Sequence, residues 1–535
     1  MDKLSDTARQ RLYGWGIWPL WLLLTTSLVF RSIIPIDETR YLSVAWEMWL
    51  RNDFLVPYLN GQPYSHKPPL LFWLIQGGWV VFGLNEWWPR LVGPGCALIN
   101  LWLSRKLAYR LWPDAPEVGL LTPWILIATL LWTLFATAAM FDMLLADCVL
   151  LAMLGLLVFN QGQSGKGSLY LAVAIGLGLL AKGPVVLLHI LPVALWLNFW
   201  RADSKMAPNW LALPCALLAG IGLALAWAVP AATFGGADYG QAIFWHQTVD
   251  RTIGTEIHAR PFYWYVLFLP LILFPWLVWS RLWQSSLTVP WRADPGLRFC
   301  LVWLLGGFSV FSILPSKQIH YLIPLLPAFA LWVARIISRP HVHADTGVDK
   351  IIPLAVAGIG LVLILLPYLP GLSKLHWTQT IQPGWGLAVF SIAVLQVLIV
   401  RLSGKLSLLY LAVSIVVAIV ISFRCFFQYN GAAYDLRPAA EHLKRLNEQH
   451  IPCVFIGNYQ GQLHFLGRLS QPLATINASE IIEWARRHPE GYLISLEKNQ
   501  PTAVDYLQPH RESWLVFRMA GRLTGPQLWA NQKLW

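Results

Sequence analysis

The sequence has little charge. Asp, Glu, Lys and Arg together make up only 12% of the 535 residues, whereas 56% of the residues are hydrophobic and 31 are tryptophan. A soluble chain of this length cannot bury so much apolar surface, so the composition excludes an ordinary soluble globular protein. It indicates an integral membrane protein whose chain crosses the bilayer many times.

Acidic residues are the scarcer charged class. The chain has 27 Asp and Glu against 39 Lys and Arg, which gives a formal net charge of +12. The basic residues are scattered among short loops and form no single patch, so the excess does not indicate a nucleic-acid partner. We expect these cations to face the anionic headgroups of membrane lipids instead.

Cysteine is also rare. The six cysteines show no metal-site spacing, and four of them lie in apolar segments, where a thiol is usually a small buried hydrophobe. The first apolar run lacks a small-residue cleavage site after it. The sequence therefore predicts a retained first span and not a removed signal peptide.

Apolar segments close to the length of a membrane crossing recur along residues 1–424. They predict about thirteen transmembrane helices. The predicted spans are 15–34, 90–108, 118–137, 143–160, 168–181, 185–200, 209–232, 262–281, 297–314, 319–338, 351–369, 383–402 and 405–424. The run from Leu70 to Leu84 is short for a crossing and follows Pro68 and Pro69.

The distribution of Lys and Arg favours one orientation. If Leu70–Leu84 is an interfacial helix, Arg105, Lys106, Arg110 and most other loop cations fall on one side, which the positive-inside rule assigns to the cytoplasm. The N-terminus is then cytoplasmic and the first loop, residues 35–89, is external. We therefore expect the candidate reactive groups of the first loop to face the outer side of the membrane.

The same alternation brings the candidate reactive groups to the outer face. Asp142, Lys182, the polar segment 233–261 with His246 and His258, and Lys317 with His320 all fall on the side of the first loop. The orientation rests on the balance of Lys and Arg between the two sides, so the presence of the acidic and histidine groups on the same side indicates a functional face.

The character of the chain changes after about residue 425. Helix-like segments over Pro438–Gln449 and Ala478–His488 alternate with strand-like segments over Cys453–Gly457, Gly491–Leu496 and Trp514–Met519. The sequence thus predicts an all-α polytopic membrane domain, residues 1–424, followed by a small α/β domain, residues 425–535, on the outer face.

Two neighbouring carboxylates, Asp37 and Glu38, stand at the outer end of the first span. They could open the amphipathic helix Thr39–Leu50 as N-terminal acidic residues. Alternatively, a carboxylate at the water–lipid boundary could act as a general base or orient an acceptor. Both interpretations can hold, with Glu38 or Thr39 in the structural role, so Glu38 stays a catalytic candidate beside Asp37.

A third acid, Asp142, lies in the apolar run AAMFDMLLAD. Its place at the boundary of a predicted span makes it a candidate for a substrate or metal contact. Asp147 lies deeper, where an unpaired carboxylate is expensive, so it should pair with a neighbouring helix or stay protonated.

Several cations stand at outer boundaries of the predicted spans. Lys67 lies on an aromatic-flanked turn after Tyr64 and before the double proline, where an ammonium group is well placed to hold a phosphate. Singly, each of these cations is an interfacial anchor, but together they indicate an anionic lipid site. The others are Arg260, Lys182 and Lys317, the last with Tyr321 close by.

Two histidines, His66 and His258, could ligate a divalent metal ion together with a carboxylate. They belong to no tight spacing motif, so the sequence leaves metal dependence open.

These motifs resemble a known family. DETRY, VPYLNGQPYSHKPPL and FGLNEWWPR resemble the first external loop of the lipid A aminoarabinose transferases, which belong with the protein O-mannosyltransferases among the multi-span GT-C enzymes. The resemblance extends through AAMFDMLL, LLAKGPVVLL, FWHQTVDRTIGTEIHARPFYWYV and FSILPSKQIHYLIPLLPAFAL, and so covers roughly the first 340 residues.

The resemblance implies a transferase whose donor is a sugar on undecaprenyl phosphate and whose acceptor is lipid A, another glycan or a protein. Asp37 would be the catalytic or acceptor-orienting carboxylate and Asp142 a second active-site acid. The lipid-linked phosphate would be held by Lys67, Arg260, Tyr64 and Tyr321. His258 would be a potential metal ligand.

The chain departs from the family at one position. Aminoarabinose transferases typically have Tyr-Phe-Glu-Lys where this chain has Tyr64-Ser65-His66-Lys67. The change removes a negative charge that could pair with a cationic aminosugar, or it changes a metal ligand from oxygen to nitrogen. The sequence therefore leaves the transferred sugar open.

Two other functions fit parts of the pattern. A relative of the protein O-mannosyltransferases would differ only in using secreted proteins as acceptors. A transporter or flippase of lipid-linked sugars would show inverted repeats and charged groups at the midplane, whereas this sequence has no such repeat and its candidate groups gather at one face.

Overall fold

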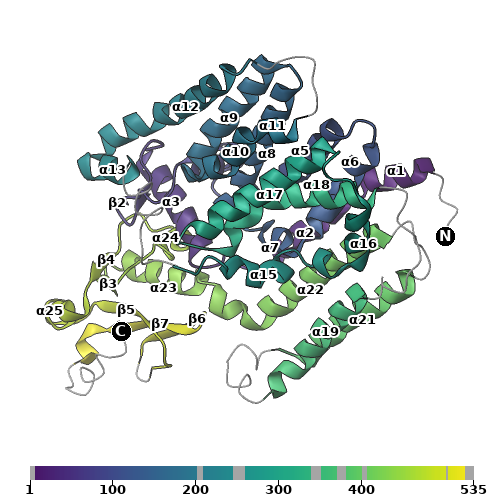
Figure 1. The fold of residues 1–535 in the computed structure, drawn as a ribbon. Coiled ribbons are helices and arrows are strands. Elements are labelled where there is room, and N and C mark those ends of the chain that lie inside the picture. Colours follow the sequence, from purple (N-terminus) through teal and green to yellow (C-terminus); the bar gives the residue numbers. More distant parts are fainter. Residues whose placement is uncertain are drawn as a thin grey trace.

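The protein is mainly helical, as the computed structural model in Figure 1 shows. The structure describes residues 6–201, 209–244, 259–338, 351–369, 381–400, 407–501 and 504–523. Of the sequence-predicted site residues, only His258 lies outside this part of the chain.

The described helices up to residue 434 are α1 (Asp6–Trp15), α2 (Ile17–Thr25), α3 (Asp37–Arg51), α4 (Leu70–Phe82), α5 (Trp87–Leu111), α6 (Pro116–Ile127), α7 (Leu130–Phe135), α8 (Phe141–Asn160), α9 (Ser164–Lys182), α10 (Val185–Leu195), α11 (Leu197–Trp200), α12 (Ala212–Gly235), α13 (Ala237–Gln241), α15 (Trp264–Ile272), α16 (Ser280–Thr288), α17 (Pro295–Ile313), α18 (Leu326–Ile337), α19 (Ile351–Leu365), α21 (Pro383–Val400) and α22 (Ser407–Tyr434).

The predicted spans lie on helices or on pairs of shorter helices, wherever the structure describes them. Seven described helical segments are long and apolar enough to cross a membrane alone. Several other predicted spans are interrupted, as at Ala128–Thr129 between α6 and α7. The number of about thirteen crossings therefore stays a prediction.

The centre of the helical domain is α8, which is buried along nearly its whole length and packs against α5, α9 and α10. A helix that is apolar all round, as α8 is, must be covered on every side. Gly155 of α8 and Gly167 of α9 allow the two backbones to approach closely, because a Cβ at Gly167 would lie 2.5 Å from the backbone of Phe159. The ends of α8 are therefore held firmly by its neighbours.

The segment predicted to be interfacial forms α4, a helix of 13 residues. At 1.5 Å per residue it is about 20 Å long, shorter than the roughly 30 Å hydrocarbon core of a bilayer. Its length is consistent with the interfacial prediction. Together with α3 and the hairpin of β1 (Tyr58–Leu59) and β2 (Gln62–Pro63), α4 builds the first loop.

The C-terminal part forms the predicted α/β unit. Its five strands have the order β4-β3-β5-β7-β6, with parallel pairing around β3 and antiparallel pairing around β7. The strands are β3 (Cys453–Ile456), β4 (Ala474–Ile476), β5 (Tyr492–Glu497), β6 (Tyr506–His510) and β7 (Ser513–Met519), and the helices are α23 (Arg437–Glu448), α24 (His464–Gly467) and α25 (Ile481–Arg487).

The predicted helices and the predicted strands β3, β5 and β7 match this unit, while β4, β6 and α24 were not predicted. The predicted boundary near residue 425 falls inside α22, which continues to Tyr434. In Figure 1 the sheet lies at one end of the helical domain, beside α3 and α24.

The C-terminal unit is docked on the first loop. The hydroxyl of Ser43 on α3 donates to the carbonyl of Gly461 at 2.6 Å and accepts from the amide of Phe465 at 3.1 Å. The Asn60 side chain makes two hydrogen bonds with the backbone of Leu473, at 2.9 and 2.8 Å. Trp79 of α4 stacks on Phe465 with 5.5 Å between ring centroids.

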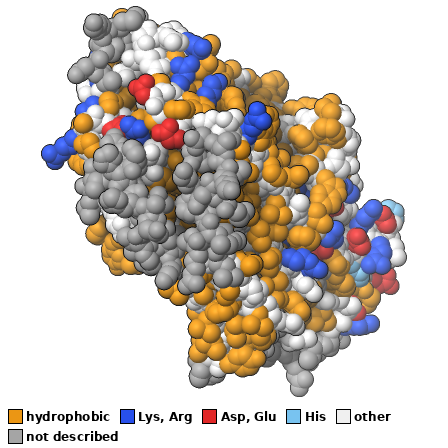
Figure 2. All heavy atoms as spheres, turned by 90° about the vertical axis from the view of Figure 1, so that its right-hand side faces the viewer, with side chains coloured by type: hydrophobic (Ala, Val, Ile, Leu, Met, Phe, Trp, Pro, Cys, Tyr) orange, Lys and Arg blue, Asp and Glu red, His pale blue; other side chains and the backbone are white. Residues whose placement is uncertain are grey.

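The surface matches a membrane protein. Figure 2 shows hydrophobic side chains over much of one face, while Lys and Arg gather mainly toward its upper part and its right-hand edge. Many large apolar side chains of α12, α19 and α21 are exposed, including Leu218, Leu354 and Leu395. Lipid would cover such side chains in a bilayer.

Candidate active site

A buried ion pair joins α8 and α9. Asp142 lies in the first turn of α8 and Lys182 is the last residue of α9, so each charge complements the dipole of its own helix. The Lys182 ammonium lies 2.5 Å from an Asp142 carboxylate oxygen, and the two side chains are only 7% and 3% exposed. Gly183, at φ +72°, follows Lys182 and ends α9 with a backbone conformation that suits glycine.

The segment before α18 covers this pair. The Lys182 ammonium lies 4.7 Å from the centre of the Tyr321 ring, and the His320 ring contacts that of Tyr321 with centroids 4.9 Å apart. His320 lies within electrostatic range of both Asp142 and Lys182. It was not among the predicted site residues, although the run KQIHY that contains it was quoted for Lys317 and Tyr321.

The aromatic turn of the first loop packs against the start of α8. The Phe141 ring contacts Tyr41 and Phe72 edge to face, with centroids 4.9 and 5.6 Å apart. The Lys67 ammonium lies 5.6 Å from the centre of the Phe141 ring. Lys67 is also within electrostatic range of Asp142 and His320.

Tyr64 is buried beneath this turn. Its ring lies 6.5 Å from that of Phe72 and 5.4 Å from that of His66. Tyr64 and Lys67 therefore belong to one packed aromatic cluster with Phe141, whose neighbour in the chain is Asp142. The sequence predicted Tyr64, Lys67 and Asp142 separately, and the structure brings them together.

Asp37 is the more accessible acid. It stands in the first turn of α3 with half of its side chain exposed, and it forms an ion pair with Arg40. Arg40 also donates to the Gln460 side chain of the C-terminal unit at 3.1 Å. Arg40 was not predicted as a site residue, though it lies in the DETRY motif. Asp37 stands one turn before Tyr41 on α3, and the Tyr41 ring contacts Phe141, the chain neighbour of Asp142.

Glu38 has a structural environment. Its carboxylate accepts two hydrogen bonds from Arg31, at 2.7 and 3.0 Å, and one each from the amides of Ile34 and Ala139, both at 2.8 Å. Burial alone would raise the pKa of Glu38, but the charge and hydrogen bonds of Arg31 lower it. Both carboxylate oxygens are engaged, so the structure gives Glu38 a positioning role and leaves it no open face for proton transfer.

Glu38 also positions α8. Arg31 donates to the carbonyl of Thr137 at 2.6 Å, and Ala139 donates to Glu38, so this ion pair clamps the segment just before Asp142. The backbone conformation just before Asp142 therefore depends on the Arg31–Glu38 ion pair, and Arg31 lies at the end of the first predicted span.

Lys317 and Arg260 lie at the rim of the site. The Lys317 ammonium donates to the backbone carbonyls of Arg260 and Leu314, and Arg260 donates its amide to Pro315 at 3.1 Å. Lys317 therefore fastens two backbone segments. The Arg260 side chain is exposed and lies 6.0 Å from the Trp264 ring. No described contact joins it to the Asp142–Lys182 pair, so its phosphate role stays a prediction.

No metal centre is formed by the described residues: no group of three or more His, Cys, Asp or Glu side chains among them could hold an ion. His66 contacts Tyr64, and His258 lies outside the described residues. The predicted metal role of both histidines remains untested.

Comparison with known proteins identifies the fold. A family model described as dolichyl-phosphate-mannose-protein mannosyltransferase matches residues 66–234, which include Lys67, Asp142 and Lys182. The chain is 30% identical over 382 residues to the undecaprenyl phosphate-alpha-4-amino-4-deoxy-L-arabinose arabinosyl transferase of Pseudomonas paraeruginosa, covering 68% of this chain and 66% of that protein.

The corresponding protein of Pseudomonas aeruginosa strain UCBPP-PA14 is 30% identical over 330 residues, or 58% of each chain. The chain thus spans about three fifths to two thirds of these relatives. The crystal structure of ArnT from Cupriavidus metallidurans bound to undecaprenyl phosphate matches 98% of this chain and 100% of its own, with a TM-score of 0.75 and 19% identity.

These comparisons confirm the predicted fold class, a polytopic GT-C membrane protein with a small C-terminal α/β domain. They also confirm the resemblance to the aminoarabinose transferases that the motifs indicated.

Proposed function

We propose that this chain is an integral-membrane glycosyltransferase that takes a sugar from undecaprenyl phosphate and transfers it to an acceptor at the outer face of the membrane. The observation that carries the proposal is the cluster around Phe141 and His320, where Asp142, Lys182 and Lys67 meet beside the N-terminal turns of α3. This is the arrangement that a lipid-linked phosphate requires: fixed cations at the ends of membrane helices, with a carboxylate beside them.

Lys67 and Lys182 stabilise the leaving phosphate. The bond between the anomeric carbon and the phosphate oxygen breaks, and its electron pair remains on undecaprenyl phosphate, whose charge the two ammonium groups offset. The Asp142 carboxylate lies 2.5 Å from the Lys182 ammonium and so orients it. The phosphate of the donor then binds the same ammonium group beside Asp142.

Asp37 activates the acceptor. An acceptor oxygen attacks the anomeric carbon in line with the leaving group, so its configuration inverts. If the acceptor is a hydroxyl, its proton passes to Asp37. If the acceptor is a phosphate, no base is needed, and Asp37 orients the nucleophile. Arg40, paired with Asp37 and bonded to Gln460, links this carboxylate to the C-terminal unit.

The transferred sugar is 4-amino-4-deoxy-L-arabinose or a related sugar, and the acceptor is lipid A. The names of the relatives support the donor sugar and its lipid carrier, whereas the choice of lipid A as acceptor is supported by the resemblance of the first-loop motifs to the lipid A aminoarabinose transferases. The local chemistry differs at His66, which replaces the family's usual glutamate, so a sugar without the amino group is the alternative donor. The mannosyltransferase family model favours a protein hydroxyl as the second candidate acceptor.

The proposed orientation is a bacterial inner-membrane protein with a cytoplasmic N-terminus and a periplasmic site. The positive-inside distribution of the loop cations supports it. With the site on that face, the C-terminal unit docked on α3 is periplasmic too.

Native mass spectrometry of the gently purified full chain tests the donor site. We expect a bound undecaprenyl phosphate, or its glycosylated form, and about tenfold weaker binding in Lys67→Ala, because a charge-assisted phosphate contact is removed. The matched control is Lys106→Ala on α5, whose ammonium lies over Trp102, away from the site.

Transfer assays with lipid A and with a hydroxyl-bearing peptide then identify the acceptor. Finding only ordinary phospholipid in the wild-type protein after adding undecaprenyl phosphate would contradict the transferase proposal and favour another function.

A further inference from the structure

A second cavity lies at the other ends of the helices that carry the candidate site. It has a volume of about 340 Å³. Helix α8 begins at the site with Asp142 and ends at the cavity with Asn160, a helical rise of about 27 Å. Likewise Gly296 at the start of α17 and Arg335 near the end of α18 line the cavity.

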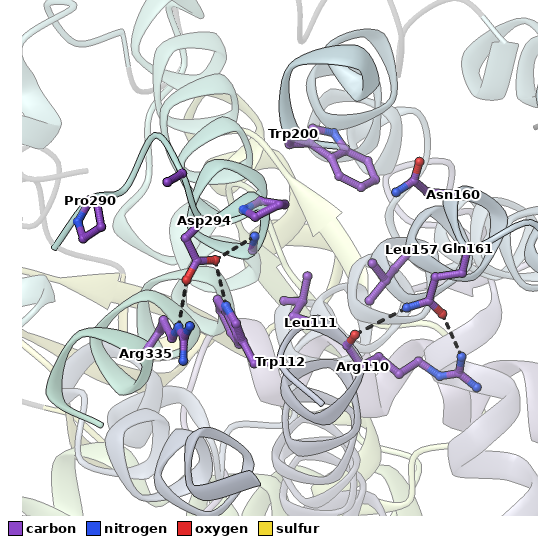
Figure 3. A pocket seen from close by; sticks show the side chains of 13 residues that line it. Arg110, Leu111, Trp112, Leu157, Asn160, Gln161, Trp200, Pro290, Asp294 and Arg335 are labelled. Atoms are coloured by element: carbon purple, nitrogen blue, oxygen red, sulfur yellow. Dashed lines mark hydrogen bonds and ion pairs between the residues drawn. The ribbon is translucent and has the colours of Figure 1, made fainter. Parts of the chain in front are cut away.

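The walls of the cavity combine aromatic and polar groups, as Figure 3 shows. Asp294, Arg335 and Trp112 form one side, and Arg110 with Gln161 forms another. The ring of Trp200 and the side chains of Leu111 and Leu157 supply apolar surface. The size and this mixture are typical of a site for a small ligand or a headgroup.

Asp294 is the one carboxylate among the described residues that line the cavity, and its oxygens already have partners. Asp294 accepts hydrogen bonds from the Trp112 indole at 2.8 Å and from the amide of Gly296 at 3.0 Å, and it also binds the Arg335 guanidinium at 2.8 Å. It therefore serves as the N-cap of α17. With Asp294 neutralised by Arg335, Arg110 leaves the cavity with an excess positive charge.

Arg110 is held in place for a ligand. Its guanidinium donates to the Gln161 side chain at 3.0 Å, and the Gln161 amide donates back to the Arg110 carbonyl at 3.4 Å. No carboxylate among the described residues pairs with Arg110. An arginine fixed by neutral partners keeps its charge available to an anion.

Asn160 is a second polar residue whose surroundings indicate a bound ligand. Its side chain is only 7% exposed, it lines the cavity, and its Oδ1 atom has no hydrogen-bond partner in the part of the chain that the structure describes. An unsatisfied buried acceptor destabilises the fold unless a ligand or water supplies a donor. The amide also carries two donors of its own, so it suits a group that has both phosphate oxygens and hydroxyls.

We propose that this cavity binds the headgroup of an anionic glycerophospholipid, a phosphodiester with hydroxyl groups such as phosphatidylglycerol. Arg110 holds the phosphate, the headgroup hydroxyl donates to Asn160, and Trp200 with Leu157 contacts the upper part of the acyl chains. In the proposed orientation, the lipid belongs to the cytoplasmic leaflet, whose lipids face the basic loops.

The location favours a lipid over a soluble phosphate. The cavity lies at the ends of apolar helices that are long enough to span a bilayer, where headgroups are concentrated. Tryptophan beside arginine at such a depth is the pattern of an interfacial anchor. A lipid there would tie α5, α8, α17 and α18 together at the end opposite the candidate site.

The test uses the full chain in a neutral detergent, with phosphatidylglycerol, phosphatidylcholine or inorganic phosphate added. Native mass spectrometry measures bound lipid, and thermal unfolding measures the stabilisation that it confers. The key variant is Asn160→Leu, because replacing an unsatisfied amide by an apolar group of similar size should leave the lipid-free protein as stable as before, or more so. Arg110→Ala is the second variant, and Lys106→Ala on the same helix is its control for charge.

We expect phosphatidylglycerol to bind and to raise the unfolding temperature of the wild-type protein and of Lys106→Ala. Binding should be about tenfold weaker in Asn160→Leu and Arg110→Ala. Lys67→Ala should bind this lipid normally, which separates the cavity from the proposed donor site. Unchanged binding in both cavity variants, or equal stabilisation by inorganic phosphate or phosphatidylcholine, would overturn the proposal.

Discussion

The ammonium nitrogen of Lys182 lies 2.5 Å from a carboxylate oxygen of Asp142, and this contact joins the end of α9 to the beginning of α8. Both side chains are almost completely buried. The pair therefore serves two purposes: it removes the cost of two isolated charges, and it fixes one cation beside the aromatic ring of Tyr321.

Breaking this pair should destabilise the protein. Asp142→Asn or Lys182→Met alone leaves a buried charge without its partner, which should lower the free energy of unfolding by about 3–5 kcal/mol. The double variant should recover most of that stability and yet remain inactive in sugar transfer. Thermal unfolding and transfer assays on the three variants check both statements; single variants as stable as the wild-type protein would contradict the first.

Asp37→Asn should affect the reaction and not the fold. Asp37 is half exposed, so its loss should leave the unfolding temperature nearly unchanged, while the rate of transfer to a hydroxyl acceptor falls about 10²–10⁴-fold. Undecaprenyl phosphate should still bind, as native mass spectrometry would show. If transfer continues at the wild-type rate, Asp37 is not the base.

Glu38→Gln should affect the stability of the fold and not the chemical step. The amide cannot accept the bidentate contact of Arg31, so we expect a loss of stability of about 3 kcal/mol at neutral pH, with a loss of activity that follows the loss of folded protein. Thermal unfolding beside Asp37→Asn makes the matched comparison, because the two acids are neighbours in the chain. A Glu38→Gln protein that is stable but inactive would contradict the positioning role.

The contribution of Glu38 should also depend on pH. Arg31 outweighs burial and lowers the pKa of Glu38 from its ordinary value of 4.5. A lowered folded-state pKa contributes stability that is fully present above the ordinary value and is lost as the pH falls through the folded-state pKa. The difference in unfolding temperature between wild type and Glu38→Gln should therefore be constant near neutral pH and shrink below pH 4.5.

Ser43→Ala should loosen the C-terminal unit. The change removes two hydrogen bonds and leaves the carbonyl of Gly461 and the amide of Phe465 without their partner, at a cost of about 1–3 kcal/mol each. Hydrogen exchange should increase over residues 461–473 and remain unchanged in α8. Ser422→Ala on α22 is a control, because that hydroxyl donates to the carbonyl of Ala418 within its own helix.

Much of the site could be named from the sequence, because a charge beside an apolar segment is conspicuous. Asp142, Lys182 and Lys67 were predicted one by one in this way, and Tyr321 was predicted from its place beside Lys317 and from the family resemblance. Their pairing could not be predicted, because α8, α9 and the segment before α18 are separate in the chain and their contacts depend on how the helices pack. The sequence pattern places His320 on the outer face and Arg40 lies in the DETRY motif, but neither was assigned to the site, because the contacts of both depend on the same packing.

The C-terminal unit shows a similar limit. The strands β3 and β5 are apolar and β-branched, so they were predicted, whereas β4 is a short strand whose residues are mostly exposed. Nothing in the hydropathy or charge pattern of the sequence predicted that this unit docks on the first loop. Ser43, Asn60 and Trp79 are ordinary residues of α3, a hairpin and α4, and their importance comes from partners more than 380 positions away.

The amino-acid sequence by itself determined that this chain enters a membrane, where its helices lie and at which ends its reactive charges stand, because hydropathy and charge act locally along the chain. Only the tertiary structure decided which charge meets which. It pairs Glu38 with Arg31, Asp142 with Lys182 and Asp37 with Arg40, and it places Asn160 at a cavity where its Oδ1 has no hydrogen-bond partner among the described residues. Those choices depend on side-chain packing between distant helices, and a buried charge or amide takes its role from whatever that packing places beside it.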